Sequence, residues 1–147
     1  MTASAYRFPS RKELTRLSAL ASPLLHFNLA EELAQLRSRA LWQRGARRSS
    51  KTLVKYPDLH IVLVLMKGNS RMGTHHVDAR ISIHAIEGRI RVRLAEEVLE
   101  VSSGELVTLD YARPHDVEAI EESAFLISIS WPGGTKEERH AWKQNIS

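Results

Sequence analysis

The fold is decided by the stretch from Gly68 to His115, which reads GNSRMGTHHVDARISIHAIEG (68–88), RIRVRLAEEVLEVSS (89–103) and GELVTLDYARPH (104–115). Two runs of β-type residues each end in a histidine-bearing segment, and a hairpin punctuated by glycine separates them. This pattern predicts a small β-barrel built around one pocket.

The clearest strand signal is RIRVRL (89–94), in which every second residue is an arginine and the others are apolar. Such alternation predicts a strand with its apolar side chains inward. HIVLVLM (60–66) is a β-branched run typical of a strand buried on both faces. Further strand-like runs lie at 79–86, 96–101, 105–110, 114–120 and 123–130. Short strands with turns about every 8–12 residues indicate an antiparallel sandwich or barrel.

Helical signals stand on either side of the strands. Ser10 to Glu13 has the spacing of a capping box and predicts a helix over 10–21. A second helix is expected over 29–42, where Leu29, Leu33, Leu36 and Ala40 mark one face and Trp42 closes it. That face should pack against the barrel or a second subunit. A short last helix is expected from Thr135 to Trp142.

The 147-residue chain has no cysteine, which excludes disulfides and thiolate chemistry. It has no apolar run long enough for a signal segment or a membrane span. We therefore expect one soluble, cytoplasmic domain without a membrane partner.

Positive charge gathers in the first third of the chain. Residues 1–56 hold 11 Lys and Arg against 3 Asp and Glu, whereas residues 57–147 hold 10 against 14. The densest run is RGARRSSK, from Arg44 to Lys51, which could meet nucleic acid or an acidic partner. No aromatic platform or recognition motif accompanies it, so we favour a solvated linker that packs against acidic residues of its own or a neighbouring chain.

The same residues resemble the cupins, a family of jelly-roll barrels with two loose motifs. The first motif falls on Gly68, Thr74, His76, Ile81 and Gly88, and the second falls on Gly104, Asp110, Ala112, His115 and Ala119. The resemblance covers about 50–131 and is closest to small single-domain bacterial cupins. It implies an all-β, cupin-type antiparallel sandwich over 52–131, a basic helical arm over 1–51 and a tail over 132–147.

In the family, three histidines and a glutamate hold a divalent metal. Here Thr74 and Ile81 replace two of those ligands, so only His76 and His115 carry over. His75 could supply a third ligand if a β-bulge near Gly73 turned it inward. The resemblance thus implies a reduced histidine site for one divalent ion, such as Zn, Fe, Mn or Ni.

The pocket that this fold implies is mostly apolar. Its expected lining is Ile81, Ile83, Val107 and Leu109. A small, largely hydrophobic ligand suits such a lining. Arg80 and Arg113 near the mouth could meet a carboxylate, although exposed arginines at strand ends more often only aid solubility.

Three functions stay open from the sequence. We favour a cupin that binds a small molecule, through a metal or directly, in a sensing, regulatory or accessory role. The second is a metal-dependent enzyme of dioxygenase or isomerase type, which the fold permits but does not establish. The third is an interaction or nucleic-acid module that acts through Arg44 to Lys51. A homodimer is expected from the apolar helix face and the open sheet edges.

Overall fold

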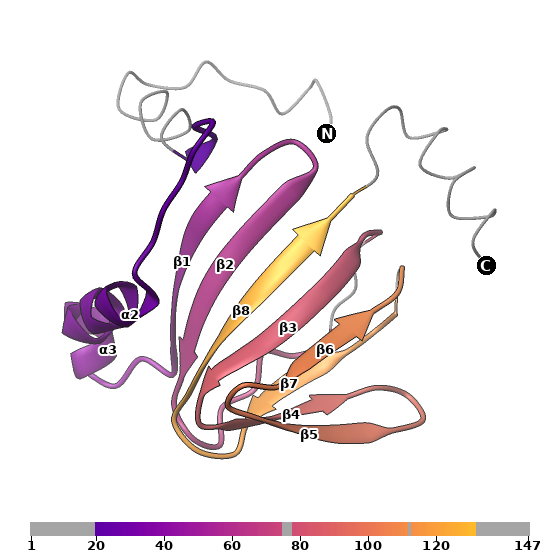
Figure 1. Cartoon of the computed structure of the whole chain (residues 1–147). Helices are drawn as coiled ribbons and strands as arrows, with labels where there is room; N and C mark the ends of the chain where they lie inside the picture. Colours follow the sequence, from indigo (N-terminus) through magenta and orange to yellow (C-terminus); the bar gives the residue numbers. More distant parts are fainter. Residues whose placement is uncertain (1–19, 75–77, 112, 132–147) are drawn as a thin grey trace, which may run out of the picture.

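The computed structural model describes residues 20–74, 78–111 and 113–131. Two antiparallel sheets form a sandwich, and two short helices lie outside it beside β1 (Figure 1). The helices are α2 (Leu29–Ser38) and α3 (Ala40–Gln43). The strands are β1 (Arg48–Lys55), β2 (Leu59–Met66), β3 (Arg80–Glu87), β4 (Arg89–Arg93), β5 (Val98–Ser102), β6 (Leu106–Leu109), β7 (Asp116–Ala119) and β8 (Ser123–Ser130).

The larger sheet has the strand order β1-β2-β8-β3-β6, and the smaller has the order β5-β4-β7. All strand pairs within them are antiparallel. The predicted all-β antiparallel sandwich is therefore confirmed. In the described part of the chain, no helix is long and apolar enough to cross a membrane.

β2 is buried on both faces, as its continuous apolar run predicts. Val64 and Met66 face the core between the two sheets. Leu63 and Leu65 face a second core, which lies between the larger sheet and the helices. Successive side chains of a strand point to opposite faces of the sheet. A strand with an apolar core on each face therefore needs apolar residues at successive positions.

The β4 register is also as predicted. Ile90 and Val92 are fully buried between the sheets. The intervening arginines lie on the outer face, where Arg91 and Arg93 both pair with Glu118 of β7, at 3.0 and 3.1 Å. A slip by one residue would move these guanidinium groups into the core, so the alternation specifies the pairing.

α2 begins where its sequence signals place it. The side chain of Asn28 accepts a hydrogen bond from the backbone N–H of Glu31 at 3.1 Å, which caps the helix. Leu33 and Leu36 are buried against the larger sheet of the same chain. The apolar face of α2 is thus covered within the chain, and it no longer argues for a second subunit.

The single helix expected over 29–42 is interrupted at Arg39, which is a correction to the sequence interpretation. Arg39 has extended backbone angles, and its guanidinium donates to the carbonyl oxygen of Ser50 at 2.8 Å. The break starts α3, whose Trp42 is buried in the second core. Nζ of Lys67 lies 4.5 Å from the centre of the Trp42 ring. The hydrogen bond from Arg39 to β1 and the burial of Trp42 stabilise the broken arrangement more than a continuous helix would be stabilised by its apolar pattern.

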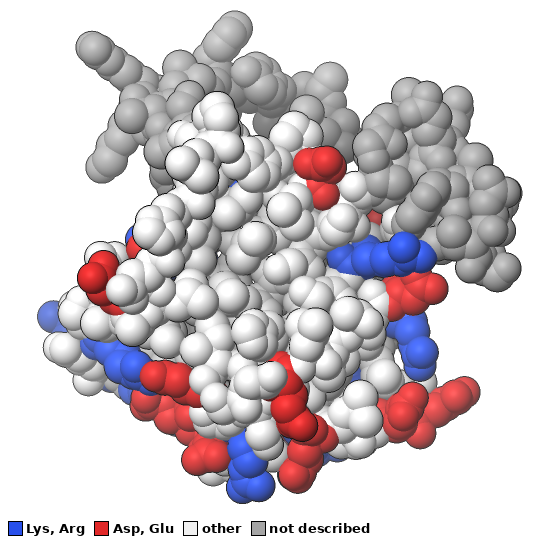
Figure 2. Space-filling model, in the orientation of Figure 1, with Lys and Arg blue, Asp and Glu red and all other residues white. Residues whose placement is uncertain are grey.

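Ion pairs fasten the helices to the sandwich. Arg37 bonds to Glu87 at 2.5 Å and to Glu122 at 3.3 Å. The hydrogen bond to Glu87 is the main reason that the pKa of Arg37 is raised, since it favours the charged guanidinium. Lys51 of β1 bonds to Glu32 of α2 at 2.6 Å. Figure 2 shows charged side chains of both signs mixed along the lower margin of the face in view, with an uncharged centre above them.

The strand series begins at Arg48, inside the segment that the sequence assigns to the arm (1–51). The Arg44–Lys51 run is therefore partly an edge strand. Arg47 donates to the carbonyl of Gly68 at 2.6 Å, so two of its cations, Arg47 and Lys51, bind groups of their own chain. The helix expected over 10–21 lies almost wholly outside the described residues, and the one expected over 135–142 lies entirely outside them.

Candidate functional site

The segment that follows β2 lies along β7. The backbone N–H of Asn69 donates to Ala119 at 2.8 Å, and that of Met72 donates to Val117 at 2.9 Å. Arg71 and Glu118 form an antiparallel bridge. Residues 69–72 therefore cover the β7 edge of the smaller sheet, next to the second histidine motif.

Asp116 secures this arrangement. Its side chain is 2% exposed, Oδ2 accepts a hydrogen bond from Nε of Arg71 at 2.7 Å, and Oδ1 accepts one from the backbone N–H of Gly73 at 2.9 Å. A buried carboxylate is costly unless it is paired and hydrogen-bonded, and here it is both. The loop that leads to His75 is thereby held to the residue after His115.

His115 is the candidate metal ligand that lies within the described residues. Its side chain is 2% exposed, and Nδ1 lies 3.0 Å from the carbonyl oxygen of Arg113. A carbonyl oxygen only accepts, so Nδ1 carries the proton in this contact and Nε2 is the nitrogen that could coordinate a metal or accept from a ligand.

A cavity of about 280 Å³ opens beside His115. Its lining is Arg48, Ser50, Val62, Val64, Met72, Ile81, His115, Ile127 and Ile129. The β1, β2, β3 and β8 residues in this set occupy cross-strand positions of one sheet face, because Ser50 pairs with Val64 and Val62 with Ile127. The cavity is thus the interior of the sandwich, with apolar walls and three polar side chains.

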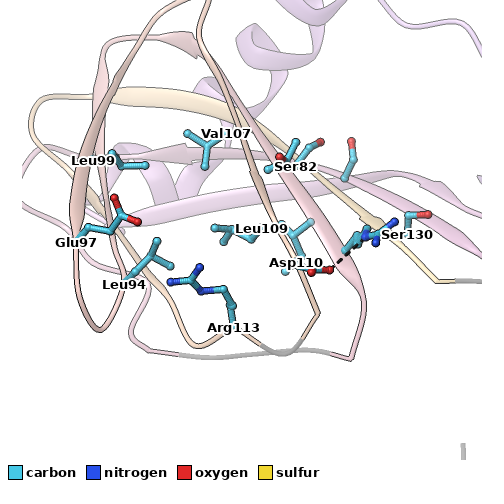
Figure 3. A pocket seen from close by; sticks show the side chains of 13 residues that line it. Ser82, Leu94, Glu97, Leu99, Val107, Leu109, Asp110, Arg113 and Ser130 are labelled. Atoms are coloured by element: carbon cyan, nitrogen blue, oxygen red, sulfur yellow. Dashed lines mark hydrogen bonds and ion pairs between the residues drawn. The ribbon is translucent and has the colours of Figure 1, made fainter. Parts of the chain in front are cut away.

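A larger cavity of about 550 Å³ lies at β6. Figure 3 shows Leu94, Leu99, Val107 and Leu109 around one side of it, with Arg113 and Glu97 nearby. Its lining includes adjacent residues of the same strands, such as Ile81 with Ser82 and Thr108 with Leu109. Adjacent residues point to opposite faces, so this hollow passes around the edge strand and is an open groove. We therefore place the candidate site in the smaller, interior cavity.

The predicted pocket residues are divided between these spaces. Ile81 lines both cavities, and Val107 and Leu109 line the larger one. Ile83 is fully buried in the core between the sheets, and neither cavity includes it in its lining. Ile83 belongs to the core cluster that also holds Ile90 and Val92 of the smaller sheet, and this packing between the sheets buries it.

The two mouth arginines differ from each other. Arg80 pairs with Asp110 at 3.3 Å and lies 5.4 Å from the centre of the Tyr111 ring, so its charge is already compensated. Arg113 lines the larger cavity. His84 is exposed on the face opposite Ile81, as its strand position predicts.

The proposed metal ligands are only partly within the described residues. His75 and His76 lie outside them, so their approach to His115 stays a prediction. Within the described residues, no three His, Cys, Asp or Glu side chains form a group that could hold a metal. Ile81, at the position of the family's glutamate, is an apolar wall of the cavity. A site built from the predicted ligands would therefore hold its ion by imidazoles alone, without a carboxylate.

Three residues of the site were missed in the sequence, namely Arg48, Ser50 and Asp116. The first two were read as part of a linker, although Arg48, Ser50 and Thr52 alternate with residues that face the helices. Asp116 follows His115 directly, and no local pattern distinguishes its carboxylate from an exposed one.

No protein-family model matches the sequence, and no curated protein matches it significantly. Solved structures do resemble it. A cupin-2 domain-containing protein from Shewanella frigidimarina superposes with a TM-score of 0.58 at 16% identity, over 71% of this chain and 93% of that one. The chain has the cupin fold.

Two further structures with the cupin fold extend the comparison. KdgF from Halomonas sp. has a TM-score of 0.55 at 21% identity, over 57% of this chain and 80% of that one. The salicylate 1,2-dioxygenase from Pseudoaminobacter salicylatoxidans, solved with gentisate, has a TM-score of 0.66 at 14% identity. That match covers 76% of this chain but 34% of the dioxygenase chain, so it concerns one part of a larger enzyme. At these identities the likeness establishes the fold alone.

Proposed function

We propose that this protein is a small-molecule-binding cupin with a sensing, regulatory or accessory role, and that its binding site is the interior cavity beside His115. The observation that carries the proposal is the pairing of an apolar cavity, open at Arg48 and Ser50, with one buried imidazole. Its volume of about 280 Å³ lies just below the usual range of ligand pockets, roughly 300–1,000 Å³, so it suits a small ligand.

We further propose that His76, His115 and His75 hold a divalent ion at this cavity. The bond from Gly73 to Asp116 supports the proposal, because it holds the chain that leads to His75 next to His115. Such an ion would act as a Lewis acid that polarises a ligand oxygen. The residues of this chain would orient the ligand and keep water from it through the apolar walls.

We prefer a binding role over catalysis because two of the four positions that hold the metal in the family carry other residues in this chain. Thr74 and Ile81 stand at two of the four positions, and Ile81 offers no donor atom to the cavity. A centre with three imidazoles would leave room for a ligand oxygen, but it lacks the carboxylate. The dioxygenase shows that a larger protein with this fold can be an enzyme, and that activity belongs to that protein. A cytoplasmic location and a homodimer remain part of the proposal.

Titration of the chelator-free protein with Zn²⁺ and Mn²⁺ tests the metal part. Wild-type protein should bind one ion, and His115→Ala should lose it. His84→Ala is the matched control, because His84 is exposed on the other face of β3. Since His115 is buried, its truncation should also cost on the order of 1–3 kcal/mol of stability. His115→Gln, which keeps a polar side chain, is the second variant, and circular dichroism should show that both are folded. Equal ion binding by His115→Ala and wild type would remove His115 from the site.

A further inference from the structure

The polar side chains of the interior cavity carry charge of one sign. Among the described residues that line it, Arg48 is a cation and none is an Asp or Glu. The open groove at β6 differs, because Glu97 and Asp110 accompany Arg80 and Arg113 there. The described lining of the interior cavity therefore holds one positive charge and no negative charge to compensate it.

Arg48 faces this cavity from the edge strand β1. It pairs with Met66 across the strands, and Met66 belongs to the core between the sheets, so both side chains lie on the inner face. Arg48 itself is exposed, which places it at the mouth of the cavity. Ser50, two residues further on the same face, adds a hydroxyl group.

Arg48 also differs from most arginines of the described segments in having no bonded partner there. Eight others each donate to an acid or a carbonyl: Arg37, Arg39, Arg47, Arg71, Arg80, Arg89, Arg91 and Arg93. A guanidinium presents donors in a planar fork that matches a carboxylate, so an uncompensated arginine at a cavity mouth suits an anionic group.

We propose that Arg48, assisted by Ser50, binds the carboxylate of the ligand, so that the ligand is a small organic acid with an apolar body. The apolar body would lie against Val62, Val64 and Ile127, and the carboxylate would lie at the mouth. This inference rests on the proposed function, because it requires that the interior cavity binds a small molecule. Recognition would be direct, through the fork of Arg48, and it would not require a metal.

Arg48 has a competing explanation as an edge-strand device. An inward-pointing charge on an edge strand hinders pairing with another sheet, and β1 is an edge of the larger sheet. The two explanations make different predictions. Recognition of a carboxylate requires that Arg48 changes ligand preference, whereas edge protection requires only that it changes self-association.

Matched pairs of acid and amide test the proposal. The probes are 3-methylbutanoate with 3-methylbutanamide, and benzoate with benzamide, each titrated calorimetrically into the full chain. Wild-type protein should bind each acid about tenfold or more tightly than its amide, since a charge-assisted hydrogen bond is lost with the amide. Arg48→Gln should remove this preference, because it should weaken the binding of each acid far more than the binding of its amide. Arg44→Gln is the control, because Arg44 is an exposed arginine outside both cavity linings.

The outcomes separate this inference from the proposed function. Binding of acid and amide with equal affinity by wild type, or an acid preference that survives in Arg48→Gln, would overturn the inference and leave the cavity as a binding site. Absence of binding for all four probes would overturn both. Self-association of Arg48→Gln on gel filtration with an unchanged acid preference would assign Arg48 to edge protection.

Discussion

The carboxylate of Asp116 accepts a hydrogen bond from Nε of Arg71 at 2.7 Å, across 45 positions of sequence. Asp116 also holds Gly73, and it adjoins His115. One buried carboxylate thus joins the two segments that carry the candidate histidines.

Replacing Asp116 by Ala should lower the free energy of unfolding by about 1–3 kcal/mol, because the Gly73 N–H and the Arg71 guanidinium lose their acceptor. Glu100→Ala is the matched control. Glu100 pairs with Arg91 on the outer face with its side chain 53% exposed, so its loss should cost roughly 0–1 kcal/mol. Urea unfolding of both variants measures the difference. Equal changes in the two variants would mean that Asp116 does not fasten the loop.

The burial of α2 predicts a second difference. Leu36 is fully buried and Leu41 is 72% exposed. Leu36→Ala should therefore cost about 2–5 kcal/mol, through lost burial and the cavity left behind, whereas Leu41→Ala should have little effect. Removal of residues 1–43 should destabilise the sandwich further, since it uncovers Leu53, Leu63 and Leu65. A truncated protein with an unchanged melting temperature would contradict this account of the helices.

Gly88 supplies a third test, at the turn between β3 and β4. Its φ is +75°, and a Cβ there would lie 2.4 Å from the carbonyl oxygen of Glu122. Gly104 has a similar φ of +89° but open space around it. Gly104→Ala should cost about 1–2 kcal/mol for the left-handed conformation, and Gly88→Ala should cost about 1–3 kcal/mol more for the clash. Thermal unfolding that ranks the two variants equally would show that the clash is relieved.

His60 predicts a dependence of stability on pH. Burial, and then the charge of Lys55, lower its pKa from the ordinary value of 6.5. As the pH falls through 6.5, the unfolded chain takes up a proton before the folded one, so the stability decreases with falling pH. The decrease should stop below the lowered pKa of the folded state, and it should be absent above about 6.5.

Urea unfolding at a series of pH values, for wild type and His60→Gln, measures this effect. The variant should lose the His60 part of the slope below pH 6.5. It should also show an offset at every pH, because the His60 ring contacts Trp131 with ring centres 4.7 Å apart. Parallel pH profiles that differ only by the offset would assign no titration to His60.

The strands could be predicted from the sequence because their signals are local. The alternation of Arg89 to Arg93 and the apolar run of β2 each specify a strand and its faces, and both are confirmed. The start of β1 was missed because Arg48 to Lys51 has polar residues on both faces. An edge strand can be polar on both faces where one face lines a cavity and the other meets a helix. The interruption at Arg39 depends on a hydrogen bond to Ser50 of β1. The spacing of apolar residues along a helix does not predict such a bond.

The site was less predictable than the fold. His115 was predicted from a motif spacing and Ile81 from its regular strand face, and both line the interior cavity. Ile83 shares that face and was assigned to the pocket with Ile81, but it is fully buried in the core between the sheets. Arg48 and Asp116 act through the pairing of distant segments, and a single sequence without its fold does not reveal such pairing.

The central claim is that the interior cavity beside His115 is the binding site, and native mass spectrometry of chelator-free protein tests it most directly. Wild-type protein should carry an added mass, of a small molecule, a metal ion or both. His84→Ala should keep that mass, and His115→Gln should lose it while remaining folded. If the added mass is the same in wild type and His115→Gln, the cavity beside His115 is not the binding site.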